Sequence, residues 1–197
     1  MIEQEFTPTL IDILESLLFA TDTPLTLDQL RNIVEQSEDQ ILPALDKLEK
    51  TYNFRKDAFY LAKIAGGYQL RTRPDFNSWI QRLHHSDKLF LSKASIETLS
   101  IVAYKQPIVR SEIEHFRGVD SGGVLKTLLE LKLIRIVGRK EIPGRPIVYA
   151  TTSKFLEHFG LASLKDLPTI QEAVDSGVPP TLPLENREIP FSEAKME

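Results

Sequence analysis

The sequence predicts a mainly α-helical protein with small β-hairpin wings (α+β), built as two tandem winged helix-turn-helix domains followed by a flexible C-terminal tail. Apolar residues recur at helical spacing in two successive sets of three segments. Each set is followed by two short β-rich runs and one more helical segment, which is the element order of a winged helix. We expect an N-terminal domain over residues 1–84, a linker over 85–90, a C-terminal domain over 91–168 and a tail over 169–197.

The first two helices are predicted from their caps and their apolar faces. Thr7 is a suitable N-cap, and Pro8 fits the first helical position because no N–H is needed there. The core-facing side chains that follow are Leu10, Ile13, Leu14, Leu17 and Leu18. The second helix is predicted to begin at Thr26, where Gln29 completes a capping box.

The third helix of this domain follows Ser37. Pro43 lies inside the apolar pattern and has no backbone N–H to donate. We therefore expect the regular part of this helix to begin near Gln40.

A hairpin and one more helix complete the first domain. Residues 59–64 and 68–72 are expected to pair through a tight turn in which Gly66 and Gly67 adopt positive φ. The helix over 74–83 has four apolar residues at helical spacing, which are Phe76, Trp79, Ile80 and Leu83.

The C-terminal domain repeats this order of elements. Helices are predicted over 91–104, 109–116 and 153–159, with hairpin strands over 133–138 and 146–151. Gly118 is expected to end the second helix in the left-handed conformation, and Asp120 to N-cap the third.

The segment after residue 168 differs in composition from the rest. Residues 168–197 include five of the 12 prolines, and residues 161–197 have 3 basic and 7 acidic side chains, a net charge of -4. Such a segment buries too little apolar surface to offset its chain entropy, so a flexible tail is predicted.

Several classes of function are disfavoured by composition. The absence of cysteine excludes disulfides, thiolate metal sites and cysteine nucleophiles. Phosphate-binding loops, metal-ligand spacings, secretory signals and membrane-spanning runs do not occur in the sequence. We therefore expect a cytoplasmic protein that is not an enzyme and needs no cofactor, small-molecule substrate or membrane. The run from Asp120 to Gly123 is similar to the nucleophile region of trypsin-like proteases, so a hydrolase using Ser121 is kept as a minor alternative.

A winged-helix DNA-binding transcriptional regulator is the main alternative. Residues 85–160 have 12 basic and 8 acidic side chains, a net charge of +4. The candidate recognition helices, however, are rich in acidic residues or neutral overall, which disfavours base reading. The second wing carries four cations, Arg135, Arg139, Lys140 and Arg145. Arg135, Arg139 and Lys140 are candidates for non-specific DNA contact, and the favoured alternative is a solvated hairpin whose arginines pair with carboxylates of the same protein or of a partner.

Several spaced blocks of residues resemble the segregation and condensation protein B family. They are Ser95–Ile108, Arg117–Ser121, Leu133–Ile134, Gly138–Arg139, Pro143–Pro146, Tyr149–Thr152, Phe155–Leu156 and Phe159–Leu161. These blocks extend over residues 91–168, and the first domain matches more loosely through Gly66–Leu70 and Thr72–Pro74.

The resemblance implies a function that composition and periodicity do not reveal. Members of this family are tandem winged-helix subunits that form homodimers, largely through the N-terminal domain. They bind the kleisin subunit, segregation and condensation protein A, and so reach the SMC ATPase that organises and segregates the bacterial chromosome. The implied protein associates with the nucleoid and with chromosomal DNA only indirectly.

Two segments are carried over from the family as candidate kleisin contacts. They are the turn Arg117-Gly118-Val119-Asp120 and the wing Pro143-Gly144-Arg145-Pro146. Prolines on both sides would hold Arg145 outward for a partner carboxylate, although both segments could merely shape the domain. The family often has threonine in place of Val109, so the following helix lacks that side-chain cap. Leu14 and Leu18 are candidate dimer contacts and equally good core residues.

Overall fold

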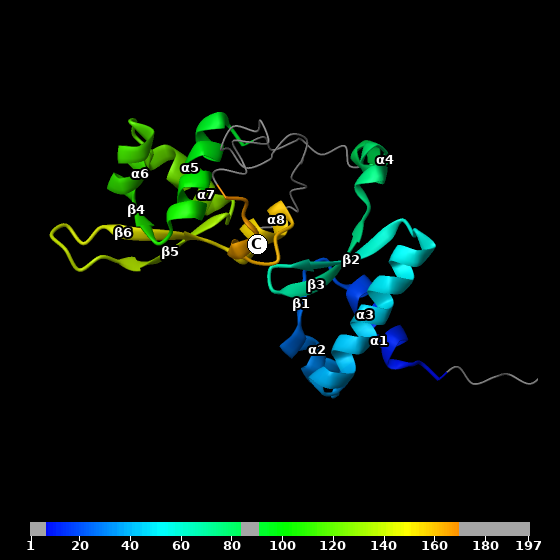
Figure 1. The fold of residues 1–197 in the computed structure, drawn as a ribbon. Helices are drawn as coiled ribbons and strands as arrows, with labels where there is room; N and C mark the ends of the chain where they lie inside the picture. The colour runs from blue at the N-terminus through cyan, green and yellow to red at the C-terminus, as the bar shows by residue number, and fades with distance from the viewer. Residues whose placement is uncertain (1–6, 84–90, 170–197) are drawn as a thin grey trace, which may run out of the picture. The chain divides into compact units, whose positions relative to one another are not determined.

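The computed structural model describes residues 7–83 and 91–169, and the chain divides into two compact units, Met1–His85 and Ser86–Glu197 (Figure 1). The predicted linker and almost all of the predicted tail lie outside the described residues. Each unit has helices packed on a small antiparallel sheet, so the predicted α+β class is confirmed.

Unit 1 contains three helices, a three-stranded sheet and a final short helix. In chain order its elements are α1 (Leu10–Ala20), β1 (Leu25–Thr26), α2 (Leu27–Val34), α3 (Glu38–Arg55), β2 (Phe59–Ile64), β3 (Gly67–Thr72), the 3-10 turn η1 (Pro74–Phe76) and α4 (Asn77–Leu83). The sheet has the order β1-β3-β2. Its core is formed mainly by leucines of α1, α2 and α3 packed against the sheet.

Two helix starts in unit 1 differ from the prediction. The N-cap of α1 is Thr9 and not Thr7, because Thr9 N–H donates to Asp12 Oδ2 at 2.8 Å and completes a capping box two residues after the predicted N-cap. Helix α3 begins at Glu38, and Pro43 lies within it. Ser37 N–H donates to Gln40 Oε1 at 3.3 Å, and the carbonyl left unpaired by Pro43 lies in the exposed first turn, where water can bind it.

The hairpin turn of unit 1 also differs in detail. Ala65 and Gly66 adopt positive φ, whereas Gly67 is the first residue of β3. A Cβ atom on Gly67 would lie 2.7 Å from the carbonyl oxygen of Leu25. Gly67 is therefore required by the close approach of β1, a two-residue strand that is too short to leave a periodic pattern in the sequence.

Unit 2 has the same order of elements. They are α5 (Lys93–Lys105), β4 (Ile108–Val109), α6 (Arg110–Arg117), α7 (Gly122–Glu130), β5 (Ile134–Arg139), β6 (Ile147–Thr151), α8 (Ser153–Phe159) and the 3-10 turn η2 (Leu164–Asp166). The sheet order is β4-β6-β5. Helices α5, α6, α7 and α8 cover the sheet with a core that includes Leu99, Ile113, Leu128 and Phe155, each fully buried.

Candidate protein-binding site

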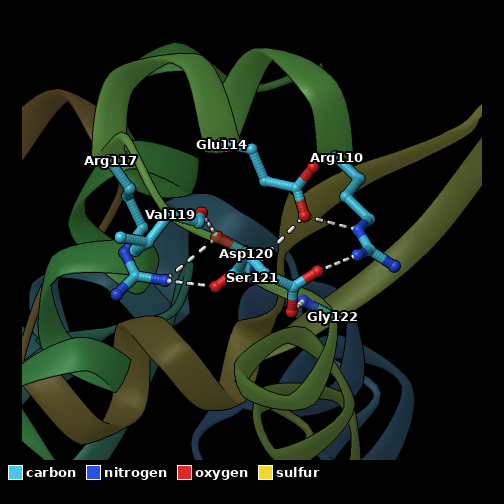
Figure 2. A network of polar contacts seen from close by, with 7 residues as sticks. All are labelled: Arg110, Glu114, Arg117, Val119, Asp120, Ser121 and Gly122. Atoms are coloured by element: carbon cyan, nitrogen blue, oxygen red, sulfur yellow. Dashed lines mark hydrogen bonds and ion pairs between the residues drawn. The ribbon is translucent and has the colours of Figure 1, made fainter.

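The turn between α6 and α7 is held by the side chain of Arg117. Arg117 Nη1 donates to the carbonyl oxygen of Asp120 at 3.3 Å and to Ser121 Oγ at 3.0 Å (Figure 2). Its Nη2 lies 3.8 Å from Glu97 on α5, and only 7% of the side chain is exposed. Both terminal nitrogens of the Arg117 guanidinium are thus engaged inside unit 2, which favours the shaping role over a direct contact with a partner.

A second arginine holds the outer side of the same turn. Arg110 Nε donates to Glu114 Oε1 at 2.6 Å, and its Nη2 donates to Asp120 Oδ2 (Figure 2). Glu114 Oε1 also accepts the backbone N–H of Ser121 at 3.0 Å. That N–H and the Arg110 guanidinium hold the pKa of Glu114 below its ordinary value.

The start of α7 corrects one prediction. Its N-cap is Ser121 and not Asp120, although Asp120 Oδ1 still accepts the N–H of Gly122 at 3.1 Å. The side chain of Ser121 is fully buried in the turn, where no substrate could reach it, and this contradicts the hydrolase alternative. Gly118 ends α6 with φ 74, as predicted. A Cβ atom on Gly122 would lie 2.8 Å from Arg110 Nη1, so the glycine leaves room for the arginine.

Helix α6 begins without a side-chain cap at Val109, as the departure from the family pattern predicts. The N–H of Val109 instead donates to Glu112 Oε2 at 3.0 Å. The opposite oxygen, Glu112 Oε1, accepts from Lys140 Nζ at 2.6 Å and so ties the wing to α6. The bond from Lys140 and then the bond from Val109 hold the pKa of Glu112 below its ordinary value.

The cations of the second wing are mostly engaged within unit 2. Lys140 pairs with Glu112, and Arg145 Nη2 donates to Glu141 Oε1 at 2.9 Å. Arg135 Nε donates to the carbonyl oxygen of Thr151 at 3.4 Å, and Arg139 Nη1 donates to that of Arg145 at 3.1 Å. Two of the four cations thus pair with carboxylates of unit 2, and the other two donate to backbone carbonyls of the wing.

The tip of the wing turns sharply at Gly144 and Arg145. Both residues adopt positive φ, 84° and 39°, between Pro143 and Pro146. The side chain of Arg145 is 67% exposed. The same hairpin exposes three apolar side chains, Ile136, Val137 and Ile142. The wing therefore presents exposed apolar side chains beside three exposed arginines, Arg135, Arg139 and Arg145.

A pocket of about 430 Å³ opens beside the base of this wing. It is lined by Lys105, Pro107, Ile108, Ser111, Glu112, His115 and Phe116. Phe116 is 55% exposed, and Lys105 Nζ lies 5.6 Å from the centre of its ring. We call this feature the α6 pocket. Sequence reasoning missed it, although a phenylalanine within the otherwise polar second half of α6 was an available signal.

The candidate dimer residues Leu14 and Leu18 lie in the core of unit 1. They are 0% and 1% exposed, so their side chains pack inside the unit and cannot contact a second copy. The core alternative is therefore correct, and a dimer surface must be sought among exposed residues.

Two other kinds of site were sought over residues 7–83 and 91–169. In these ranges no cluster of histidine and carboxylate side chains could hold a metal ion. No helix in the same ranges has the length and apolar character needed to cross a membrane.

Comparisons with known proteins identify the family. The family model described as "Segregation and condensation complex subunit ScpB" matches residues 12–170. Segregation and condensation protein B of Syntrophotalea carbinolica is 49% identical over 160 residues, covering 81% of each chain. That of Moorella thermoacetica is 42% identical over 171 residues, covering 87% of this chain and 88% of the relative. A crystal structure described as a dimer of the ScpB N-terminal domain complexed with ScpA peptide is 26% identical, covers 37% of this chain and 91% of that chain, and has a TM-score of 0.35. On the family match and the identity to these relatives, the chain belongs to the segregation and condensation protein B family.

Proposed function

We propose that this protein works as a homodimer that binds the kleisin, segregation and condensation protein A, through the α6 pocket and the adjacent wing of unit 2. Through the kleisin it joins the SMC ATPase, which supplies the ATP chemistry, and reaches chromosomal DNA indirectly. The protein itself performs no catalysis and acts in the cytoplasm at the nucleoid. Membership of the family supports the general role, and the α6 pocket is the observation that supports this binding site.

The shape of this surface fits an amphipathic segment. The half-exposed ring of Phe116 and the exposed apolar side chains of the wing, Ile136 and Ile142, would each cost free energy if left in water without a partner. An amphipathic helix or an extended segment of the kleisin could place apolar anchors on both.

The charges around the pocket indicate the character of the neighbouring residue on the kleisin. Glu112 is neutralised by Lys140, whereas over residues 7–83 and 91–169 Lys105 contacts the Phe116 ring and forms no ion pair with a carboxylate. The pocket rim is therefore cationic. We expect the apolar anchor to be followed or preceded by an acidic side chain, which would pair with Lys105.

The hydrogen bonds that the wing cations form within unit 2 disfavour the DNA-binding alternative. Three of the four wing cations donate to oxygens of the wing itself, and the fourth, Lys140, pairs with α6. On α7, the position of a recognition helix, Lys126 lies 3.8 Å from Glu130. A gel shift at physiological salt should therefore show no preference for one duplex over random sequence, whereas a regulator would prefer its operator by a factor of roughly 10³ or more.

Calorimetry with the purified kleisin tests the binding site. Phe116→Asp removes the aromatic anchor and should weaken binding by about 30-fold or more, as for a central interface residue. Lys105→Glu should weaken it by about tenfold. Phe54→Asp is the matched control, because Phe54 is 90% exposed on unit 1 and should have no effect.

Arg145→Glu tests the wing separately, with an expected loss of about fivefold. Unchanged affinity in all three unit 2 variants would move the kleisin to another surface. Absence of any complex with the unaltered protein would refute the proposed function.

A further inference from the structure

The outer strand of the unit 2 wing, β5, has one free edge among the described residues. In the sheet order β4-β6-β5, this strand pairs with β6 alone. Every residue of β5 after Ile134 is exposed. In Figure 1 the hairpin of β5 and β6 reaches past the helices of unit 2. The backbone N–H and C=O groups on such an edge can pair with an added strand.

A bulge sets the positions of two arginines on this strand. The ladder with β6 shifts register inside β5, which adds one residue to the strand. Arg135 and Arg139 are opposite Ala150 and Ile147, so they are four residues apart on β5 but three apart on β6. Because side chains alternate along a strand, the two arginines point to opposite faces of the sheet.

The charges of these two arginines are not balanced within the part of the chain that the structure describes. The other two wing cations, Lys140 and Arg145, form ion pairs with glutamates of unit 2. Arg135 and Arg139 instead donate to backbone carbonyl oxygens, at 3.4 Å and 3.1 Å. The free edge of β5 therefore suits an extended segment with one acidic side chain on each face.

A segment beyond the described residues has this pattern. Residues 184–189, Leu-Glu-Asn-Arg-Glu-Ile, form a run of six between Pro183 and Pro190, and β5 is also six residues long. Proline has no N–H for a ladder, so a strand formed by this run would end on both sides. Glu185 and Glu188 are three residues apart, which would place them on opposite faces of that strand.

The two acids match the two arginines in either strand direction. Placed opposite Arg135 and Arg139, Glu185 and Glu188 would form one ion pair on each face of the sheet. Arg187, the one cation of the run, would then lie opposite neither arginine. A shift of one residue would remove both ion pairs, and in one direction it would place Arg187 opposite an arginine. The charges thus specify a register.

The chain is long enough to bring this run to β5 of the same unit. Tyr104 Oη donates to the carbonyl oxygen of Pro168 at 2.7 Å, which fixes the end of the described chain to unit 2. Residues 170–183, fourteen in number, would span about 45 Å if fully extended. A domain of the size of residues 91–169 has a radius of gyration of about 12 Å, and therefore a diameter of roughly 30 Å.

We propose that residues 184–189 add to the free edge of β5 in the same chain and so compete with the kleisin for the wing. The docking stands by itself, whereas the competition rests on the proposed function. A tethered segment acts at an effective concentration of about 1 mM, so a weak contact is enough to occupy the edge in most molecules. The kleisin then binds with an apparent affinity that is reduced to the fraction of molecules whose wing is open.

Paramagnetic NMR of the full chain tests the docking, because the chain has no cysteine and a single label can be introduced. A nitroxide on Ser192→Cys, close to the run, should broaden the backbone amide signals of β5. Glu185→Arg with Glu188→Arg places like charges opposite one another and should remove most of the broadening. Glu172→Arg with Asp175→Arg makes the same change of charge outside the run. It is the matched control and should keep the broadening.

A charge swap sharpens the test. Arg135→Glu with Arg139→Glu should also remove the broadening, and combining it with Glu185→Arg and Glu188→Arg should restore it, because only facing charges compensate in this way. Absence of broadening in the labelled chain with no other change would overturn the docking and leave the kleisin site intact. Broadening seen only when a spin-labelled chain is mixed with a separate isotope-labelled chain would place the run on a second copy and overturn the docking as well.

Calorimetry with the purified kleisin tests the competition. Glu185→Arg with Glu188→Arg opens the wing and should tighten kleisin binding about threefold to fivefold, whereas Glu172→Arg with Asp175→Arg should leave it within about 1.5-fold. Unchanged affinity in the first variant would overturn the competition. Absence of kleisin binding by the unaltered protein would refute the proposed function, and the NMR experiment would still decide the docking.

Discussion

The last helices of the two units have the same length but opposite surroundings. In unit 2, α8 places Phe155 and Phe159 in the core, 0% and 8% exposed, with their ring centres 4.7 Å apart. In unit 1, the corresponding helix α4 buries none of its side chains. The comparison teaches that an amphipathic helix at the end of a winged-helix module can either pack into the core of its own unit or stay exposed, and that the apolar pattern alone does not distinguish the two.

The largest expected difference is in stability. Phe155→Ala should lower the free energy of unfolding of unit 2 by about 3–5 kcal/mol, because it leaves a large cavity in a packed core. Trp79→Ala should lower that of unit 1 by less than about 0.5 kcal/mol at a protein concentration where the chain is monomeric. Urea titration followed by circular dichroism measures both, and equal losses would show that α4 is part of a core.

The two sheets offer a second comparison. Thr26 of β1 pairs with Gly67, whereas Val109 of β4 pairs with Val148 at the corresponding position. Gly67→Ala should destabilise unit 1 by about 1–3 kcal/mol, because its Cβ atom would meet backbone rather than a movable side chain. Val148→Ala is the comparison variant at the corresponding position of unit 2, because it removes side-chain atoms and brings no new atom against the backbone of β4. Thermal unfolding of both variants would contradict this account if Gly67→Ala had no effect.

The attachment of α8 is a third point of comparison. Thr152 Oγ1 accepts the N–H of Phe155 at 3.2 Å and donates to the carbonyl oxygen of Lys132 at 2.6 Å. Helix α4 has no side-chain cap of this kind, since it continues directly from η1. Thr152→Ala should therefore cost about 1 kcal/mol. Thr152→Ser keeps both bonds and should recover most of that loss in the same denaturation experiment.

The smallest expected effect concerns the wing of unit 2, which is tied to α6 by Glu112 and Lys140. The pKa of Glu112 lies below its ordinary value of 4.5 because Lys140 and the N–H of Val109 donate hydrogen bonds to the carboxylate. A carboxyl whose pKa is lowered by folding adds stability above its ordinary pKa and loses it as the pH falls through the folded value. The wing contact should thus persist at neutral pH and break only in acid, below the ordinary pKa. A carboxyl NMR titration with Glu112 at or above 4.5 would contradict this.

Much of the fold could be predicted from local signals in the sequence. The capping box at Thr26 and the left-handed end of α6 at Gly118 were both visible because they depend on neighbouring residues alone. The start of α1 was misplaced because Thr7 and Thr9 are both capable N-caps, and only the contact with Asp12 decides between them. Strands β1 and β4 could not be predicted because two residues have no periodicity and acquire strand geometry only through pairing with β3 and β6.

The candidate site was less predictable than the fold. Arg117 was selected from the family resemblance as a partner contact, but its side chain is buried beside Glu97, which lies twenty positions away on another helix. Arg145 was correctly expected to point outward, since two prolines and a sharp turn are local features. The α6 pocket was missed because it forms where the end of α5, the short strand β4 and α6 meet, and no single segment contains it.

Native mass spectrometry of the full chain mixed with the purified kleisin tests the central claim most directly. The account predicts a complex of two copies of this chain with one kleisin, in which Phe116→Asp weakens kleisin binding by about 30-fold or more. Failure to bind the kleisin, together with tight selection of one DNA operator, would contradict the account.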